Sequence, residues 1–222
     1  MFKLIIGNRA YSSWSMRGWL ACKQAGEPFD ELVVPMFDAD WEKRREGDEF
    51  APSLGKVPIL WDGDIVVWDS LAIIEFLADR FGPALYWPED EGARGMARSM
   101  AAEMHSGFAN LRRELPMNVR KSFPPMKLSE EVRSEIDRIL QLWAQARARF
   151  GGTGDFLFGD WCAADIMYAP VVTRFITYGV GVPSFAAVYM KHVLSHPDVA
   201  EWIDKAQDEP WVIEQWETDK AA

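Results

Sequence analysis

The sequence contains little of what several classes of protein require. Cysteine occurs only at Cys22 and Cys162, which are far apart and lack metal-ligand spacing. This excludes a disulfide framework and favours a reducing compartment, so we expect a cytoplasmic protein. The three histidines, His105, His192 and His196, also lack the spacing of a metal site, and we expect no metal.

Long apolar runs and an excess of basic residues are absent too. No stretch approaches the length of a membrane span, and residues 1–7 are too short for the apolar region of a signal peptide. The formal net charge of −10 argues against nucleic acid or an anionic membrane as a partner. An anionic ligand would therefore need local cations. With 222 residues, 49% of them hydrophobic, the chain is long enough for one or two compact domains.

The first eighty residues alternate strand and helix signals. Two strand-like runs around Asp62-Gly63 indicate a β-hairpin, and apolar residues recur at helical spacing from Leu71 to Phe81. The predicted elements are a strand at 3–7, a helix at 15–25, a strand at 31–35, a short helix or polar segment at 38–49, the hairpin and the helix after it. This order is that of a thioredoxin-like α/β domain.

The rest of the chain has helical periodicity throughout. Turn formers and acids over 81–91 predict a linker between a domain at 1–80 and an all-helical domain at 92–222. The predicted helices span 94–115, 129–150, 162–178 and 183–194, and a fifth begins at 196.

One ordered set of residues carries the functional interpretation. The step Val57-Pro58 is followed eleven residues later by Asp69-Ser70, which opens a helix. A helix N-terminus favours a carboxylate ligand. This set resembles the glutathione-binding half of the cytosolic glutathione S-transferases. The resemblance implies a cis proline, main-chain pairing of Val57 with the tripeptide's cysteine, and an Asp69-Ser70 pair that takes the γ-glutamyl end.

A second motif matches the same family independently. Gly159-Asp160, followed by a helix with Asp165 in its first turn, resembles the family's C-terminal motif. There a Ser or Thr caps the helix, and the buried aspartate accepts hydrogen bonds from loop amides. Cys162 stands at the Ser/Thr position, and a thiol is a weak hydrogen-bonding group, so we expect a weaker cap. We interpret Asp165 as structural.

The segment before the first helix contains the candidate catalytic residues. On the residues alone, its serines are turn and cap residues. The segment also resembles the serine-type classes, particularly zeta and tau, in which the catalytic serine lies five residues before an arginine. Counting back from Arg17 gives Ser12, with Ser13 as the neighbour that shares its role. Ser15 is expected to cap the helix, and Tyr11 is a weaker rival hydroxyl.

The resemblance also implies which residues hold glutathione and the second substrate. Arg17 helps to hold the glutathione site, and Lys56 contacts the glycyl carboxylate, with the cluster Lys43-Arg44-Arg45 as a second candidate. We expect the pocket for the electrophile between the two domains. Its expected lining is Trp14, Met104, His105 and Phe108.

The implied reaction is attack of the glutathione thiolate on an electrophilic small molecule, with no metal, in a homodimer. Maleylacetoacetate isomerase, the zeta activity, is an alternative, although that enzyme has cysteine where this chain has Trp14. A non-catalytic binding or interaction module on the same fold is another. A thiol-transferase would need cysteine at the position of Ser12. The sequence does not name the electrophile.

Overall fold

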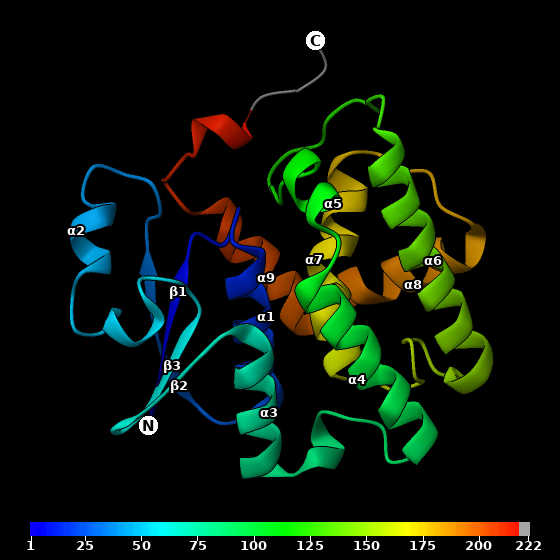
Figure 1. Cartoon of the computed structure of the whole chain (residues 1–222), viewed down its shortest axis with the longest axis horizontal. Helices are drawn as coiled ribbons and strands as arrows, with labels where there is room; N and C mark the ends of the chain where they lie inside the picture. Colours follow the sequence, from blue (N-terminus) through cyan, green and yellow to red (C-terminus); the bar gives the residue numbers. More distant parts are fainter. Residues whose placement is uncertain (218–222) are drawn as a thin grey trace.

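The computed structural model of the chain describes residues 1–217 and places a small sheet beside a larger group of helices (Figure 1). The sheet has the order β2-β1-β3-β4, in which β1 is parallel to β2 and the remaining neighbours are antiparallel. Its elements are β1 (Phe2–Gly7), α1 (Ser13–Ala25), β2 (Phe29–Val34), α2 (Trp41–Arg45), β3 (Ile59–Asp62), β4 (Ile65–Trp68) and α3 (Ser70–Phe81). The predicted thioredoxin-like arrangement is confirmed.

The hairpin between β3 and β4 has the predicted two-residue loop. The register pairs Asp62 with Ile65, which leaves Gly63 and Asp64 in the turn. Gly63 has a φ of 60°, which glycine adopts without steric penalty. The hairpin ends directly before α3, so the turn fixes where the N-terminus of that helix lies.

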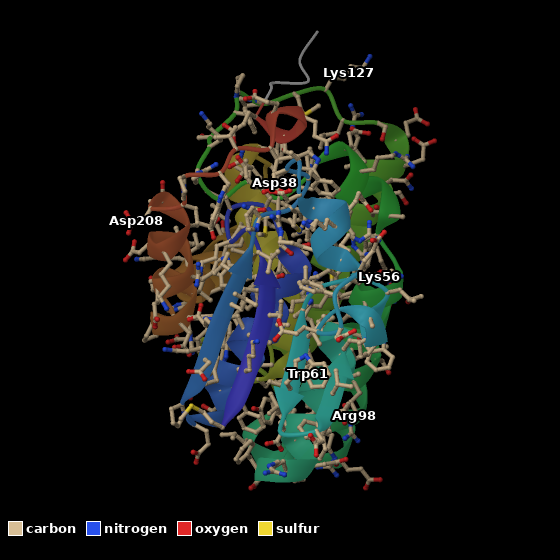
Figure 2. All side chains as sticks on the ribbon, turned by 90° about the vertical axis from the view of Figure 1, so that its left-hand side faces the viewer. Asp38, Lys56, Trp61, Arg98, Lys127 and Asp208 are labelled. Atoms are coloured by element: carbon tan, nitrogen blue, oxygen red, sulfur yellow. The ribbon has the colours of Figure 1, made fainter. Side chains whose placement is uncertain are left out.

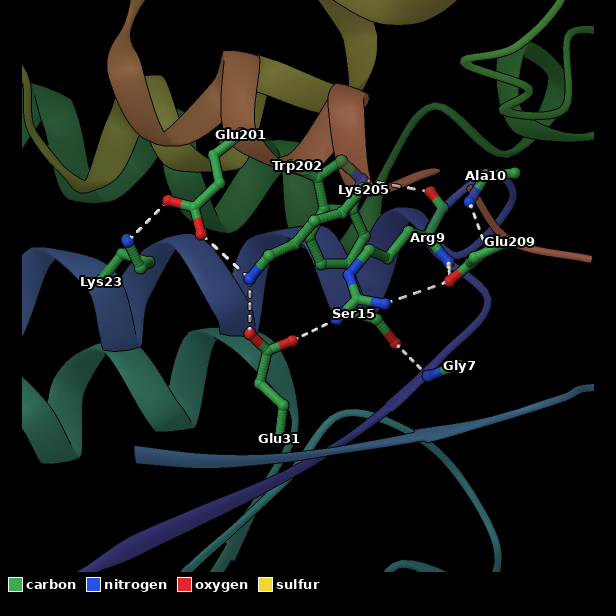
Figure 3. Close-up of polar contacts among 10 residues, drawn as sticks. All are labelled: Gly7, Arg9, Ala10, Ser15, Lys23, Glu31, Glu201, Trp202, Lys205 and Glu209. Carbon is green, nitrogen blue, oxygen red and sulfur yellow. Dashed lines mark hydrogen bonds and ion pairs between the residues drawn. The ribbon is translucent and has the colours of Figure 1, made fainter. Parts of the chain in front are cut away.

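Helix α1 begins earlier than the sequence indicated, at Ser13. The N-cap is Ser12, whose Oγ accepts a hydrogen bond from the Ser15 N–H at 3.3 Å. Ser15 lies inside the first turn, and its Oγ accepts from the Gly7 N–H at 2.9 Å (Figure 3). The expectation that Ser15 caps the helix was therefore wrong, because its hydroxyl ties α1 to the end of β1. Gly26 ends the helix with a φ of 72°.

The rest of the chain is helical, as predicted. Short 3₁₀ turns lie at Ala51–Ser53, Pro83–Leu85 and Glu214–Trp216. The helices are α4 (Glu91–Ser106), α5 (Ala109–Glu114), α6 (Glu130–Phe150), α7 (Ala163–Thr177), α8 (Ser184–Ser195) and α9 (Pro197–Gln207). Within residues 1–217, no helix is both long and apolar enough to cross a membrane.

The single helix predicted over 94–115 is two helices. α4 ends where the Gly107 N–H bonds to the Glu103 carbonyl, and Phe108 follows in the left-handed region with a φ of 57°. The new N-terminus of α5 is capped from another helix. Glu135 of α6 accepts hydrogen bonds from the main-chain N–H groups of Asn110 and Leu111 at 3.2 and 2.7 Å. A cap that comes from a residue distant in sequence explains why the local pattern did not reveal the break.

Helix α7 lies in the centre of the helical part and is buried along nearly its whole length. Asp165, in its first turn, accepts hydrogen bonds from the N–H groups of Leu157 and Cys162 and from the Tyr189 hydroxyl, at 3.0–3.1 Å. Burial raises the pKa of Asp165 to about 6, so the carboxyl is charged at pH 7. These contacts agree with the structural role that we assigned to it.

A chain of charged side chains joins the sheet to α9 (Figure 3). Glu31 of β2 contacts Arg9 and Lys205, and Lys205 also bonds to Glu201 at 2.9 Å. Nearby, Glu209 accepts from the main-chain N–H and the guanidinium of Arg9 at 2.9 and 3.3 Å. Because Glu209 is nearly buried, these bonds hold the end of α9 against the loop that leads into α1.

Candidate functional site

The N-terminus of α1 holds three serines, and the hydroxyls of two of them, Ser12 and Ser15, are hydrogen-bonded to each other. The Oγ atoms of Ser12 and Ser15 are 2.8 Å apart. Ser12 Oγ donates to Ser15 Oγ, which also accepts from the Gly7 N–H. Ser12 Oγ accepts from the Ser15 N–H, and because a hydroxyl proton can rotate, the Ser12 hydroxyl can donate to a ligand instead of to Ser15. The N-terminal end of a helix stabilises an anion, so this arrangement favours negative charge beside Ser12.

Ser13 and Arg17 follow on α1, and both point into the protein. Ser13 Oγ accepts from Arg174 Nη2 at 3.1 Å. Arg17 is fully buried, and its Nε donates to the Met167 carbonyl at 2.9 Å. Its Nη1 and Nη2 have no hydrogen-bond partner within the described part of the chain. Burial, followed by the nearby Arg174 and Arg112, lowers the pKa of Arg17 well below its usual value.

The Val57–Pro58 peptide bond is cis, as the resemblance implied. Pro58 is buried against α1, where Gly18 leaves just enough room for its ring. The ladder between β3 and β4 starts only at Ile59. Among residues 1–217, none forms a main-chain hydrogen bond with Val57. The main chain of Val57 is therefore placed to pair with an extended ligand.

Asp69 and Ser70 lie at the N-terminus of α3. Asp69 is the N-cap, and its Oδ1 accepts from the Leu71 N–H at 2.9 Å. Its φ of 78° lies in the left-handed region, which non-glycine residues rarely adopt and which is concentrated at functional sites. Ser70 is buried, yet its Oγ has no partner within the described residues. Both observations mark this turn as a place for a polar ligand.

His105 of α4 reaches the same turn. Its Nε2 lies 2.9 Å from Asp69 Oδ2, and its ring meets the Trp14 ring edge-on, with the two centroids 5.3 Å apart. Burial and the nearby Arg17 and Arg112 lower the pKa of His105, while Asp69 raises it; the net shift is downward. A neutral His105 therefore donates Nε2–H to Asp69 at pH 7. The structure thus brings Trp14 and His105 into contact, and their role in lining a pocket for the electrophile stays a prediction.

Other predicted residues lie further from this cluster. Met104 and Phe108 are buried in the main hydrophobic core. Lys56 is exposed at the surface (Figure 2). Arg44 and Arg45 are engaged with acids, Asp38 and Glu42.

The Tyr11 hydroxyl is engaged as well. It donates to Glu217 and accepts from Arg120. Burial, followed by the contact with Glu217, raises the pKa of Tyr11, which makes its hydroxyl a poorer source of a proton.

One surface hollow lies away from the predicted site. It has a volume of about 380 Å³ and lies beside the outer end of β1, lined by Met1, Lys3, Asp48, Glu49, Trp61 and Gly63. None of these side chains belongs to the predicted site. Within residues 1–217, no group of three or more His, Cys, Asp or Glu side chains is placed to hold a metal ion.

Two residues at the site were missed from the sequence. Arg174 is buried in α7 and touches Ser13, and Arg112 of α5 lies over the Trp14 ring, 4.7 Å from its centroid. Arg174 could have been found, because it is a charged residue within the apolar run of α7. An unpaired charge is rarely buried, so such a residue indicates a functional or structural role. Arg112 follows the helix break and had no such signal.

A comparison with protein families matches this part of the chain. Residues 11–80, which contain Ser12, Val57 and Ser70, match the model described as "Glutathione S-transferase, N-terminal domain". This part of the chain is a glutathione S-transferase N-terminal domain. The match includes the N-terminus of α1, the cis proline and the N-terminus of α3, and with them the unpartnered polar atoms of Arg17 and Ser70.

Comparisons with individual proteins agree with that assignment. Glutathione S-transferase 1 of Dianthus caryophyllus is 27% identical over 199 residues, 82% of each chain. A 60-residue stretch is 38% identical to dichloromethane dehalogenase of Methylorubrum extorquens, but it spans only one fifth of that protein's length. A glutathione transferase homologue of Burkholderia GL BGR1, solved with bound glutathione, has the same fold at 21% identity, with a TM-score of 0.70 over 94% of this chain and 99% of that one.

Proposed function

We propose that this glutathione S-transferase binds glutathione across the N-termini of α1 and α3. The observation that carries the proposal is the buried, unpartnered Ser70 hydroxyl beside the strained Asp69 turn. In this arrangement Ser70 donates to the γ-glutamyl carboxylate, and the carboxylate of Asp69 receives the ammonium group. Val57 pairs with the cysteinyl main chain, Lys56 takes the glycyl carboxylate, and Arg17 supplies positive charge behind the site.

The proposed catalytic step is formation of the glutathione thiolate beside Ser12. A free cysteine thiol has a pKa of about 8.5, and lowering it by ~2 units needs roughly 2.7 kcal/mol of stabilisation of the anion. The Ser12 hydroxyl, itself accepting from the Ser15 N–H, donates to the sulfur, and the helix dipole adds to this effect. Ser13 is the second candidate. The contacts of Tyr11 with Glu217 and Arg120 argue against it as the donor.

In the proposed reaction, the thiolate attacks an electrophilic carbon of a small molecule that enters near Trp14 and His105. We also propose a cytoplasmic homodimer with domains at 1–80 and 92–222. The pattern Ser12-Ser13-x-Ser15-x-Arg17 favours a second candidate, the glutathione-dependent isomerisation of the zeta type. Isomerisation of maleylacetoacetate without net consumption of glutathione would identify that activity.

The assignment of the hydroxyl is tested by the thiolate absorbance of the glutathione complex as a function of pH. Ser12→Ala should raise the pKa of the bound thiol and lower the conjugation rate, while glutathione affinity stays nearly unchanged. Ser12→Cys should form a mixed disulfide with oxidised glutathione, visible as a mass increase, because a thiol at a helix N-terminus is acidic. A curve shifted by Ser13→Ala or Tyr11→Phe, and not by Ser12→Ala, would reassign the donor. Glutathione binding without any conjugation or isomerisation would identify a non-catalytic module.

A further inference from the structure

Three arginines from three helices meet near the first turn of α1, and within the described residues none of them forms an ion pair, although Asp69 acts on Arg17 and Glu135 on Arg112 electrostatically. They are Arg17, Arg112 and Arg174, and none takes part in an ion pair of residues 1–217. Arg9 and Arg138, by contrast, each contact a glutamate. Buried cations are normally paired, so this cluster is unusual in a chain with a formal net charge of −10.

Among residues 1–217, the hydrogen bonds of the cluster go to neutral oxygens alone. Arg174 donates to the carbonyls of Leu115 and Pro170 at 2.9 and 3.0 Å and to Ser13 Oγ at 3.1 Å. Arg112 donates to the carbonyls at the end of α4, and its Nε has no partner within the described part of the chain. Together with the unpartnered Nη1 and Nη2 of Arg17, the cluster has donors that an anion would satisfy.

Electrostatics leads to the same conclusion. Burial and the neighbouring Arg112 lower the pKa of Arg174 to about 9, and burial lowers that of Arg112, which Glu135 partly offsets. A guanidinium nevertheless remains charged in proteins near neutral pH. The three cations therefore repel one another in a poorly solvated place, and a bound anion would relieve that repulsion.

The Trp14 ring contacts two of the three guanidiniums. The centre of its ring is 4.7 Å from the Cζ atoms of both Arg17 and Arg112. Trp14 is only half-buried, so its ring can turn toward solvent and open the space between these cations. A carboxylate in that space would accept charge-assisted hydrogen bonds, which are stronger than the cation–π contacts that they replace.

We propose that Arg112 and Arg174 bind a carboxylate of the electrophilic substrate, with Arg17 adding positive charge behind both ligands, so that this transferase prefers electrophiles that carry an acid group. The proposal rests on the function proposed above. Arg112 and Arg174 come from the helical part of the chain, whereas the groups assigned to glutathione come from α1, the turn before β3 and the start of α3. Through Ser13, Arg174 is one residue from Ser12, and therefore close to the proposed thiolate.

Glutathione itself carries two carboxylates, so the test must separate the two sources of the anion. The probes are 4-chloro-3-nitrobenzoate and its neutral analogue, 4-chloro-3-nitrobenzamide. In both, the glutathione sulfur forms a bond to the ring carbon and chloride leaves. The measured quantity is kcat/KM for each probe, divided by its uncatalysed rate with glutathione. Calorimetry gives the glutathione affinity of each variant separately.

We expect the wild-type protein to favour the acid by at least about tenfold, as a charge-assisted hydrogen bond would give. Arg112→Gln should bring the ratio close to one and Arg112→Lys should keep part of it, with glutathione affinity within about twofold of the wild-type value. The matched control is Arg113→Gln, on the exposed side of the same helix, which should retain the wild-type ratio. Thermal unfolding establishes that each variant is folded.

Three results would overturn the proposal. The first is a ratio near one between the acid and the amide in the wild-type protein, a result that can be obtained without any variant. The second is a preference retained in Arg112→Gln. The third is a loss of glutathione affinity in Arg112→Gln with the ratio unchanged, which would assign the anion to glutathione. If the wild-type protein does not bind glutathione, the proposed function fails. The anion site is then decided by calorimetry with 3-nitrobenzoate and 3-nitrobenzamide, where binding of the acid alone supports it and equal or absent binding contradicts it.

Discussion

Gly18→Ala tests the contact between α1 and the proline of the proposed glutathione site. A Cβ added at Gly18 would lie 2.7 and 2.8 Å from the Cγ and Cβ of Pro58. Ordinary contacts begin near 3.4 Å, so α1 and the Val57–Pro58 turn must move apart by several tenths of an ångström. The proline ring is rigid, and both elements belong to the packed core, so neither relaxes freely.

The magnitude follows from two opposing effects. Overpacking a core typically costs about 1–3 kcal/mol, whereas replacing glycine by alanine within a helix contributes about 1 kcal/mol of stability. The control is Gly95→Ala in α4, where the added Cβ meets nothing within 4 Å and only the gain remains. The free energies of unfolding of the two variants, measured by urea denaturation, should therefore differ by about 1–3 kcal/mol.

The same displacement should also weaken the use of glutathione as a substrate. Movement of Pro58 carries the main chain of Val57 with it, and misplacement near 1 Å costs on the order of a hundredfold in rate. For the smaller shift expected in Gly18→Ala, we expect roughly a tenfold loss of kcat/KM for glutathione, and no loss in Gly95→Ala. Equal stability gains in the two variants, together with equal activity, would refute the reasoning.

Three further predictions concern stability. Asp165→Asn places an N–H₂ group among three hydrogen-bond donors, so it should lower the free energy of unfolding in urea denaturation by about 2–5 kcal/mol. The control is the exposed Asp160→Asn, which should change that free energy by less than about 0.5 kcal/mol. Glu209→Gln should cost about 2 kcal/mol or more by the same assay, because a buried carboxylate that binds Arg9 is lost. The pKa of His105 is lower in the folded than in the unfolded chain, so its contribution to stability is lost as the pH falls below about 6.5. The free energy of unfolding, measured from pH 7 to 5, should therefore depend less on pH in His105→Gln than in the wild-type protein. An identical dependence in the two proteins would contradict this.

Much of the fold could be predicted because its signals are local. Turn residues and apolar periodicity revealed the hairpin before α3, the end of α1 at Gly26 and the start of α6 after Ser129. The break between α4 and α5 escaped prediction because Glu135, distant in sequence, caps the second helix. Ser15 was misassigned for a similar reason, since its hydroxyl bonds to Gly7 across the first turn of the fold.

The residues of the candidate site also differ in whether local sequence or tertiary packing places them. The resemblance to the family singled out Ser12, Val57 and Ser70, which all come from one continuous part of the chain. The predicted lining of the second pocket has a weaker basis, because helical spacing does not distinguish a side chain that faces a cleft from one that faces the core. Met104 lies in that core. Arg174 contributes to the site only through tertiary packing of α7 on α1.

The most direct test of the central claim is calorimetric titration of the protein with reduced glutathione at moderate salt. We predict saturable binding to the wild-type protein, with affinity about tenfold to a hundredfold weaker in Ser70→Ala, because a hydrogen bond to a charged carboxylate is worth about 1.5–3 kcal/mol. The control Ser99→Ala, whose exposed hydroxyl bonds to the Gly95 carbonyl of α4, should bind like the wild-type protein. Absence of saturable heat with the wild-type protein, or equal affinities for Ser70→Ala and Ser99→Ala, would contradict a glutathione site at the N-terminus of α3.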